Sequence, residues 1–366
     1  MEARLGLQMI SDHEPASLIA GLFARSPGDR AGHTFVIAEA GVNHNGDPAL
    51  AYRLVEAAAN AGADAVKFQT FKAERLVTRA APKAAYQIVN TGTTESQLEM
   101  LRRLELSEEV HRELSRRCAE LGIAFISTPF DEDSADLLAS LGVPLFKIPS
   151  GEITNIPFLE HVARIGLPIV MSTGMAYLGE VETAVRAIEG SGNNRLALLH
   201  CVSNYPAAAS DVNLRAMLTM REAFGYPVGY SDHTEGVEVA LAAVAMGACA
   251  IEKHFTLDRS LPGPDHSSSL EPSELGLLIR GIRTVESAMG HGRKEPAMSE
   301  ANTASVARRS LVAACDIPAG ITIREEMISI RRPGTGLPPA LHDLLVGRVA
   351  KKSIAEGEML SFENVG

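Results

Sequence analysis

Residues 228–256 read VGYSDHTEGVEVALAAVAMGACAIEKHFT, and this stretch holds a strand, a helix and a second strand. Val228 to Tyr230 and Ala250 to Ile251 are short apolar runs typical of strands, and the alanine-rich segment Val237 to Met246 between them ends at Gly247, as a helix does. A helix of this length carries the chain back along a sheet, so the two strands are predicted to be parallel neighbours.

The same pattern recurs along residues 33–290. Each apolar run precedes a segment of helical period that ends near glycine, such as Leu50 to Ala61, which follows the capping pair Asp47-Pro48. Eight such units closing on themselves predict an α/β protein with a (β/α)8 barrel. The eight runs are Phe35–Ala38, Ala65–Phe68, Ala124–Ile126, Leu145–Ile148, Ile169–Met171, Leu196–Leu199, Val228–Tyr230 and Ala250–Ile251.

Two histidines stand just past the last two strands. His233 and His254 are separated by 254 − 233 = 21 residues, which is about one strand, helix and strand. A lone histidine beside a strand is usually a structural residue. Two neutral imidazoles at adjacent strand ends, with the carboxylates of Asp232 and Asp265 nearby, instead favour a site for one divalent metal.

Polar residues follow every strand, where a barrel of this kind places its active site. So many inward polar groups would be costly in a purely structural core, although each serine or threonine alone is more often a turn residue. Lys67 and Lys147 among several hydroxyls indicate an anion site that holds a phosphate and a carboxylate. In chain order the polar residues are Glu39, Lys67, Gln69, Ser127, Thr128, Lys147, Ser150, Glu152, Ser172, Thr173, Ser203, Tyr205, Ser231, His233, Glu252 and His254.

The composition excludes some partners. The formal charge of −11 over 366 residues argues against a nucleic-acid or anionic-membrane partner, since either would require a basic face. The longest apolar stretch, Val239 to Ile251, is too short to span a bilayer. Four scattered cysteines and the acidic Asp12 and Glu14 ahead of the apolar patch Leu18 to Ala24 predict a cytoplasmic protein whose residues 1–32 form an extension of unassigned role.

Several ordered motifs resemble the sialic acid synthase family, and the resemblance covers the chain from about residue 33 to the C-terminus. It implies a (β/α)8 barrel followed by a small β-rich antifreeze-like (SAF) domain. It also implies that phosphoenolpyruvate condenses with an N-acetylmannosamine-type sugar and water, giving a nine-carbon 2-keto acid and phosphate. The motifs are AEAGVNHNG (38–46), VKFQTFKA (66–73), STPF (127–130), KIPSGE (147–152), STGM (172–175), SDHT (231–234), EKHFT (252–256) and PGPD (262–265).

The resemblance assigns the anion site in more detail. Lys67 and Thr128 would hold the phosphoenolpyruvate carboxylate. Lys147 and three serines would hold its phosphate, the serines being Ser150, Ser172 and Ser231. Ser203 stands where some members carry an asparagine that binds phosphate, and because Asn204 is its neighbour, either residue could be the donor.

The resemblance also implies roles around the sugar. His233 and His254 would bind Mn²⁺ or Mg²⁺, which would polarise the open-chain sugar aldehyde. Glu39 would position or deprotonate the water that adds at C2, unless it only forms a structural ion pair at the barrel mouth. Asp265 is then a sugar contact rather than a third metal ligand. The residues matching sugar-contact positions are Gln69, Glu152, Tyr205 and Asp265.

The C-terminal part repeats itself at an offset of 37 residues. A polar linker, 291–302, precedes this part, which spans 303–366, and the repeat predicts two similar β-rich halves. Alone, Arg332 in the turn Arg331 to Gly336 would be read as part of a solvated loop. The resemblance implies that Arg332 enters the partner's sugar site in a domain-swapped homodimer, and it leaves the role of Arg308 and Arg309 open. The repeat pairs Ile317, Gly320, Ile323, Glu326 and Ile328 with Ile354, Gly357, Leu360, Glu363 and Val365.

Two sugars fit the resemblance. The main prediction is an N-acetylneuraminate synthase acting on N-acetylmannosamine. The alternative is an N,N'-diacetyllegionaminate synthase acting on 2,4-diacetamido-2,4,6-trideoxymannose, and segments such as Ser267 to Pro272 are shared by both. A pseudaminate synthase is disfavoured by His266.

Three functions of other classes stay open. A Schiff-base aldolase would use Lys147 as its nucleophile. A metal-dependent barrel hydrolase would require His-x-His at the first strand, which ends here in Glu39-Ala40-Gly41. An ice-binding role leaves the polar strand ends unexplained.

Overall fold

The computed structural model describes residues 15–24, 32–91 and 95–366. The chain divides into two compact units, Met1–His291 and Gly292–Gly366. Of the predicted extension 1–32, only residues 15–24 and Gly32 are described, and the rest lies outside the described residues. None of the described helices is long and apolar enough to cross a membrane.

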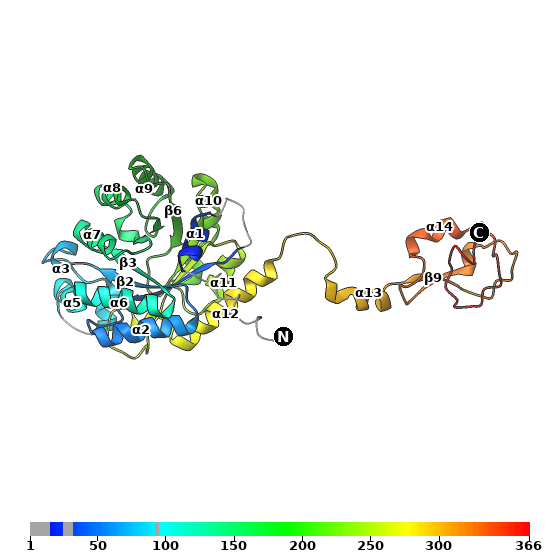
Figure 1. Ribbon diagram of the computed structural model, residues 1–366, viewed down its shortest axis with the longest axis horizontal. Helices are drawn as coiled ribbons and strands as arrows, with labels where there is room; N and C mark the ends of the chain where they lie inside the picture. The colour runs from blue at the N-terminus through cyan, green and yellow to red at the C-terminus, as the bar shows by residue number, and fades with distance from the viewer. Residues whose placement is uncertain (1–14, 25–31, 92–94) are drawn as a thin grey trace, which may run out of the picture. The chain divides into compact units, whose positions relative to one another are not determined.

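The first unit is a parallel barrel of eight strands, and the predicted (β/α)8 fold is confirmed (Figure 1). The strand order is β3-β2-β1-β8-β7-β6-β5-β4, every hydrogen-bonded pair is parallel, and β3 lies beside β4, which closes the barrel. The strands are β1 (Phe35–Gly41), β2 (Ala65–Thr70), β3 (Ala124–Pro129), β4 (Phe146–Ile148), β5 (Ile169–Ser172), β6 (Leu196–Cys201), β7 (Val228–Asp232) and β8 (Ala250–His254).

Eight helices surround the strands and bury their apolar faces against them. The predicted cap of the first is confirmed, because the Asp47 side chain accepts a hydrogen bond from the Ala49 amide and Pro48 opens the helix. The helices are α2 (Pro48–Ala61), α6 (Glu108–Leu121), α7 (Glu132–Ser140), α8 (Ile156–Ile165), α9 (Leu178–Gly190), α10 (Arg215–Phe224), α11 (Glu238–Ala245) and α12 (Pro272–Met289).

The inward residues of the barrel form an apolar layer below a polar one. Alternate residues of a strand point the same way, so Phe35 and Ile37 of β1 continue upward to Glu39. At Gly229 of β7 a side chain would lie 2.4 Å from the carbonyl oxygen of Ala250, so this lower layer has no space for one there. The apolar layer closes the bottom of the barrel and leaves the polar groups at the carboxyl ends.

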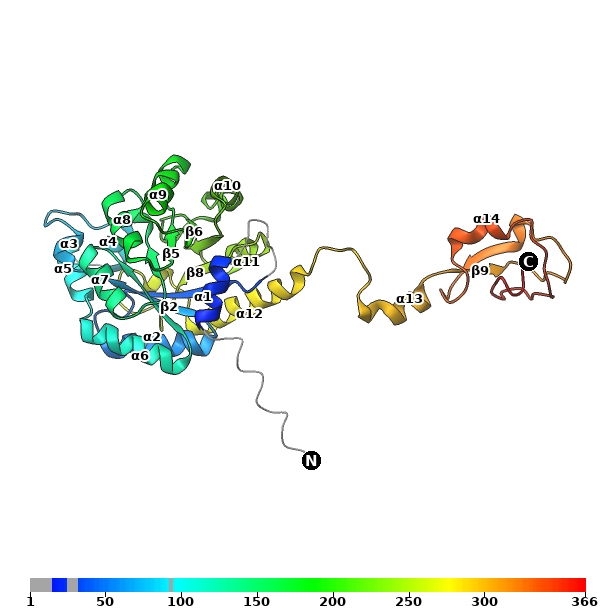
Figure 2. The same cartoon turned by 45° about the horizontal axis from the view of Figure 1, so that its top comes forward.

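Helix α1 (Pro15–Ala24) lies across the apolar end of the barrel (Figure 2). Its buried Ile19 and Leu22 pack in the same cluster as Phe35 and Ile37. The apolar patch predicted from the sequence as part of an extension is therefore the helix that covers the bottom of the barrel.

The connection from β2 to α6 carries three extra helices. They are α3 (Ala73–Leu76), α4 (Ala85–Thr91) and α5 (Gln97–Leu104). Helix α5 begins with a capping box, in which Ser96 and Glu99 satisfy each other's backbone amides. The Ala73 amide donates to Glu105 at 2.8 Å, which ties α3 to the end of α5. This inserted segment forms an apolar cluster of its own at the barrel mouth.

The second unit has one hydrogen-bonded sheet, in which β9 (Ser310–Ala313) pairs antiparallel with β10 (Ile328–Arg331). The predicted repeat is visible: Ile317 and Ile354 exchange two backbone hydrogen bonds, and Gly320 and Gly357 share left-handed φ angles of 83° and 81°. The short helices α13 (Ala301–Ala307) and α14 (His342–Leu345) flank this sheet in the chain.

Ser310 supports the turn that carries Arg332. Its hydroxyl donates to the Pro333 carbonyl at 2.7 Å and accepts from the Gly336 amide at 2.8 Å. Arg332 is exposed. The turn is therefore braced from within its own unit, while the guanidinium is available to a ligand or a partner.

Candidate active site

A cavity of about 410 Å³ opens at the carboxyl ends of the strands. It collects side chains from all eight strands or the turns that follow them, as the barrel topology requires. The predicted site residues that line it are Glu39, Lys67, Gln69, Thr128, Lys147, Ser150, Ser172, Ser203, Tyr205, Ser231, His233, His254 and Asp265.

Two buried lysines and two buried glutamates form the charged floor of the cavity. Lys67 Nζ lies 2.8 Å from Glu39 Oε2 and 3.9 Å from Glu252 Oε2, and Lys147 Nζ lies 3.5 Å from Glu252 Oε1. Burial raises the pKa of Glu252, but Lys147 and Lys67 outweigh it and hold that pKa at about 2. Glu252 is thus the ionised carboxylate that balances both lysines.

Hydroxyl groups surround the two ammonium groups. Lys67 donates to Thr128 Oγ1 at 3.0 Å, Lys147 donates to Ser172 Oγ at 2.7 Å, and Ser231 donates to Glu252 at 2.9 Å. Buried cations with directional donors around them form a site for anions of the size of a phosphate or carboxylate.

Gly174 lets two more hydroxyls approach this site. A side chain at Gly174 would lie 2.3 Å from Ser203 Oγ and 2.8 Å from Ser150 Oγ, and the Gly174 amide donates to Ser150 at 2.9 Å. Ser203 lines the cavity, whereas Asn204 is exposed. Of the two candidate donors left open by the sequence, Ser203 is the one that reaches the cavity.

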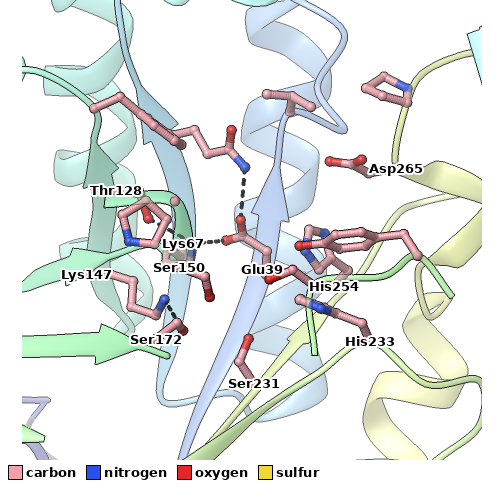
Figure 3. Close-up of a pocket in the computed structure, with 18 of the residues that line it drawn as sticks. Glu39, Lys67, Thr128, Lys147, Ser150, Ser172, Ser231, His233, His254 and Asp265 are labelled. Carbon is pink, nitrogen blue, oxygen red and sulfur yellow. Dashed lines mark hydrogen bonds and ion pairs between the residues drawn. The ribbon is translucent and has the colours of Figure 1, made fainter. Parts of the chain in front are cut away.

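Glu39 lies between two sides of the cavity (Figure 3). We call them the lysine side, with Lys67 and Lys147, and the histidine side, with His233 and His254. Gln69 donates to Glu39 Oε1 at 3.3 Å, and Lys67 pairs with its other oxygen. Burial raises the pKa of Glu39 to about 7, although Lys67 acts in the opposite direction. A carboxylate with a pKa near neutrality suits proton transfer, so the ion pair with Lys67 is compatible with a chemical role.

His233 and His254 face each other across the histidine side. Their ring centroids are 5.4 Å apart, and Tyr205 stacks on His233 at 4.1 Å. His233 Nδ1 donates to the Val202 carbonyl at 2.7 Å, which leaves Nε2 as the free acceptor nitrogen. His254 Nδ1 is buried without a hydrogen-bond partner, and burial lowers the pKa of His254 well below its usual value.

In their neutral form these two imidazoles would fit a divalent cation, since metal ligands must be deprotonated and a metal binds an oriented ring nitrogen. Within residues 15–24, 32–91 and 95–366 no cluster of three or more His, Cys, Asp and Glu side chains is arranged for a metal ion.

Several predicted residues lie elsewhere. Ser127 and Thr173, predicted among the inward polar residues, do not line the cavity. Asp232 points away from the cavity and pairs with Lys253 at 2.7 Å, because alternation along β7 turns it outward; its predicted proximity to the metal site is wrong. Glu152 does not line the cavity but accepts from Asn155 at 2.7 Å, on the short turn after β4. Arg332 belongs to the second unit.

Asp265 does reach the cavity, and burial raises its pKa to about 6. Glu252 was noted in the sequence only as one of the polar strand ends. Its spacing of two residues from His254 on one strand was the signal that could have placed both on the same face.

The fold and the cavity define an enzyme of the (β/α)8 barrel class, whose mouth combines an anion site with a histidine pair. The NeuB family model matches residues 54–294, and the SAF domain model matches residues 308–366. The chain belongs to the NeuB family and ends in a SAF domain, which confirms the predicted sialic acid synthase family and domain order. It is an enzyme of the sialic acid synthase type.

Relatives match along almost the whole chain. The N,N'-diacetyllegionaminic acid synthase of Legionella pneumophila is 50% identical over 90% of this chain and 94% of its own. The enzyme of the same name from Campylobacter jejuni is 48% identical over 89% of this chain and 98% of its own. The crystal structure of the N-acetylneuraminic acid synthetase of Leptospira borgpetersenii, with 38% identity, covers 74% of this chain and 90% of its own at a TM-score of 0.66.

Proposed function

We propose that this enzyme condenses phosphoenolpyruvate with 2,4-diacetamido-2,4,6-trideoxymannose and water, giving N,N'-diacetyllegionaminate and phosphate. The choice of sugar rests on two relatives of 48% and 50% identity. Both are named N,N'-diacetyllegionaminic acid synthase and match about nine tenths of the chain. They favour the alternative drawn from the sequence over its main prediction, N-acetylmannosamine.

The charged floor supports phosphoenolpyruvate as the anionic substrate. Lys67 and Thr128 would hold its carboxylate, and Lys147 would hold its phosphate with the surrounding serines, Ser150, Ser172, Ser203 and Ser231. Fixing both ends of this molecule orients C3 of its double bond toward the histidine side, so that the reaction with the sugar becomes effectively intramolecular.

His233 and His254 would hold a divalent cation, Mn²⁺ or Mg²⁺, which when bound would polarise the aldehyde oxygen of the open-chain sugar. C3 of phosphoenolpyruvate forms the new bond to the aldehyde carbon. The aldehyde oxygen takes up a proton and becomes a hydroxyl, and water adds to the oxocarbenium left at C2 to give a tetrahedral intermediate. This intermediate collapses to the C2 ketone as the bond between C2 and the bridging oxygen breaks, and that oxygen leaves with phosphate. Glu39 lies between the two reacting ends and would accept the proton of this water.

The remaining site residues would position the sugar. Tyr205 and Asp265 border the histidine side, and Gln69 holds Glu39 by a hydrogen bond. We infer that Arg332 completes this site in a homodimer, where the exposed turn braced by Ser310 reaches the partner's barrel. We also propose a cytoplasmic location, in keeping with the scattered cysteines of the sequence.

The bond that breaks can be followed with phosphoenolpyruvate labelled with ¹⁸O at its bridging oxygen. Incubation with purified enzyme, Mn²⁺ and the diacetamido sugar is expected to release phosphate that retains the label, together with a nine-carbon acid detected by mass spectrometry. Unlabelled phosphate would contradict carbon–oxygen cleavage. Inactivation by borohydride in the presence of EDTA would instead favour a Schiff base on Lys147.

A further inference from the structure

The cavity has a second side that carries no charge. Among the described residues of the β2–α6 connection, those that line the cavity are aliphatic except for two glutamines, Gln87 and Gln97. We name as the apolar wall the six aliphatic residues that line this side, Val42, Leu76, Val77, Met100, Leu101 and Leu104. All six belong to one packed cluster, so the wall is continuous.

The apolar wall is closed to solvent behind and held in place. Met100 is 1% exposed and Leu104 is 7% exposed, so both are packed from the protein side. The hydrogen bond from the Ala73 amide to Glu105 fixes α3 against α5. Asn90 of α4 donates to the Pro264 carbonyl at 2.6 Å, next to Asp265 in the chain. A wall with a fixed shape discriminates ligands better than a mobile loop, because little ordering cost accompanies binding.

The position of the wall determines which part of a sugar it meets. The anion site and the histidine pair fix the reacting end, where C1 of the sugar must lie. The wall is contributed by the connection after β2 and by Val42 after β1, and it borders the same cavity. The end of the sugar remote from C1 is therefore the part that extends along it.

The two candidate sugars differ at that remote end. The diacetamido sugar has an acetamido group at C4 and a methyl group as C6, whereas N-acetylmannosamine has hydroxyl groups at both carbons. A hydroxyl pressed against hydrocarbon loses its hydrogen bonds to water, which disfavours binding. A methyl group in the same place gains from the removal of its apolar surface from water.

We infer, on the basis of the proposed function, that the apolar wall selects the sugar by receiving its C6 methyl group and the methyl of its C4 acetamido group. The Gln97 amide and the NH2 group of Gln87 would match the polar atoms of that acetamido group, while the Gln87 oxygen accepts from the Ala84 amide at 2.9 Å. Specificity then depends on residues that take no part in the chemical step.

The test compares kcat/KM for the two sugars at saturating phosphoenolpyruvate, measured by phosphate release. Val77→Thr replaces a methyl group with a hydroxyl at constant shape, and Leu76→Asn places an amide on the wall. Ile88→Asn is the matched control, because Ile88 belongs to α4 but is 54% exposed and does not line the cavity. Circular dichroism and a cooperative thermal transition establish that each variant is folded.

The wild-type enzyme is expected to prefer the diacetamido sugar, and both wall variants to lower that preference about tenfold or more, as for other changes of one polar group in an apolar pocket. The control should keep the wild-type ratio, and the KM for phosphoenolpyruvate should not change. If Leu76→Asn fails to fold, the isosteric variant Val77→Thr alone tests whether the wall selects the sugar.

One outcome overturns the inference and leaves the proposed function standing. Folded wall variants that keep the wild-type preference would show that the wall does not select the sugar, while the reaction itself stands. A wild-type enzyme that prefers N-acetylmannosamine would overturn the sugar of the proposed function, and the inference with it. If the enzyme turns over neither sugar, the proposed function is wrong, and the inference is wrong with it.

Discussion

Replacing Glu252 with glutamine tests the charge balance of the cavity floor. Glu252 is buried and is the carboxylate shared by Lys67 and Lys147. Glutamine has the same shape and can still accept the hydrogen bond from Ser231, but it removes the negative charge. Lys147 then has no carboxylate within ion-pair distance among the described residues.

The magnitude follows from the two ion-pair distances. At an effective dielectric constant of 20, a separation of 3.5 Å corresponds to about 5 kcal/mol and one of 3.9 Å to about 4 kcal/mol. Removing the glutamate also removes its desolvation cost, which offsets much of this attraction. The expected net loss is about 3–5 kcal/mol, as for other buried pairs broken by removing one partner.

The assay is urea unfolding followed by far-ultraviolet circular dichroism, because the chain has no tryptophan and the eight barrel helices dominate the helical signal. Glu182→Gln is the matched control. It breaks the exposed pair with Arg186, which is expected to cost below about 1 kcal/mol. Inorganic phosphate should raise the melting temperature of Glu252→Gln more than that of the wild type, because an added anion would balance the two lysines.

An unfolding free energy for Glu252→Gln within about 0.5 kcal/mol of the control would refute the assigned charge balance. Equal stabilisation of variant and wild type by phosphate would refute the link between Glu252 and the anion site.

Three further predictions concern metal, assembly and pH. His233→Ala should abolish metal-dependent turnover and leave phosphoenolpyruvate binding detectable by calorimetry, because the histidine pair is separate from the two lysines. Inactive Arg332→Ala and Lys147→Ala variants should regain activity when refolded together, because a mixed dimer has one site with both side chains intact. Burial lowers the pKa of His44 and of His266 from 6.5 to about 4, so the folded state should lose up to about 3 kcal/mol per histidine as the pH falls between these values.

The sign of the pH effect follows from proton binding. Between pH 6.5 and pH 4 the unfolded chain holds more protons on these histidines than the folded chain, so acid favours unfolding. His44→Asn keeps an acceptor for the Gly46 amide. It should lower the slope of the unfolding free energy against pH in this range by the equivalent of one proton. An unchanged slope would contradict the assignment for His44. Full activity of His233→Ala would contradict the metal site. Mixtures of the two variants that stay inactive would exclude Arg332 acting across a dimer.

Local pattern was sufficient to predict the barrel. Strand-forming runs, helix caps such as Asp47, and glycines at helix ends are encoded within a few residues, and alternation along each strand places Glu39, Lys67 and Lys147 on the inner face. The offset repeat likewise indicated two paired halves before Ile317 and Ile354 were seen to bond.

The rest depended on which distant side chains meet. Asp232 and Glu252 are both acidic residues at strand ends, yet one pairs outward with Lys253 and the other balances two lysines inside the barrel. In each case the lysine is distant from the carboxylate along the chain, and no sequence pattern reveals the pairing.

The sequence by itself determined the strand order, the inner and outer faces and the family, because these follow from short-range periodicity and ordered motifs. Only the tertiary structure decided that Glu252 is the common counter-ion, that Glu152 turns to Asn155, and that α3 and α5 build an apolar wall beside the charged floor. The physical reason is that charge balance and cavity shape are properties of groups brought together by packing from segments far apart in the chain.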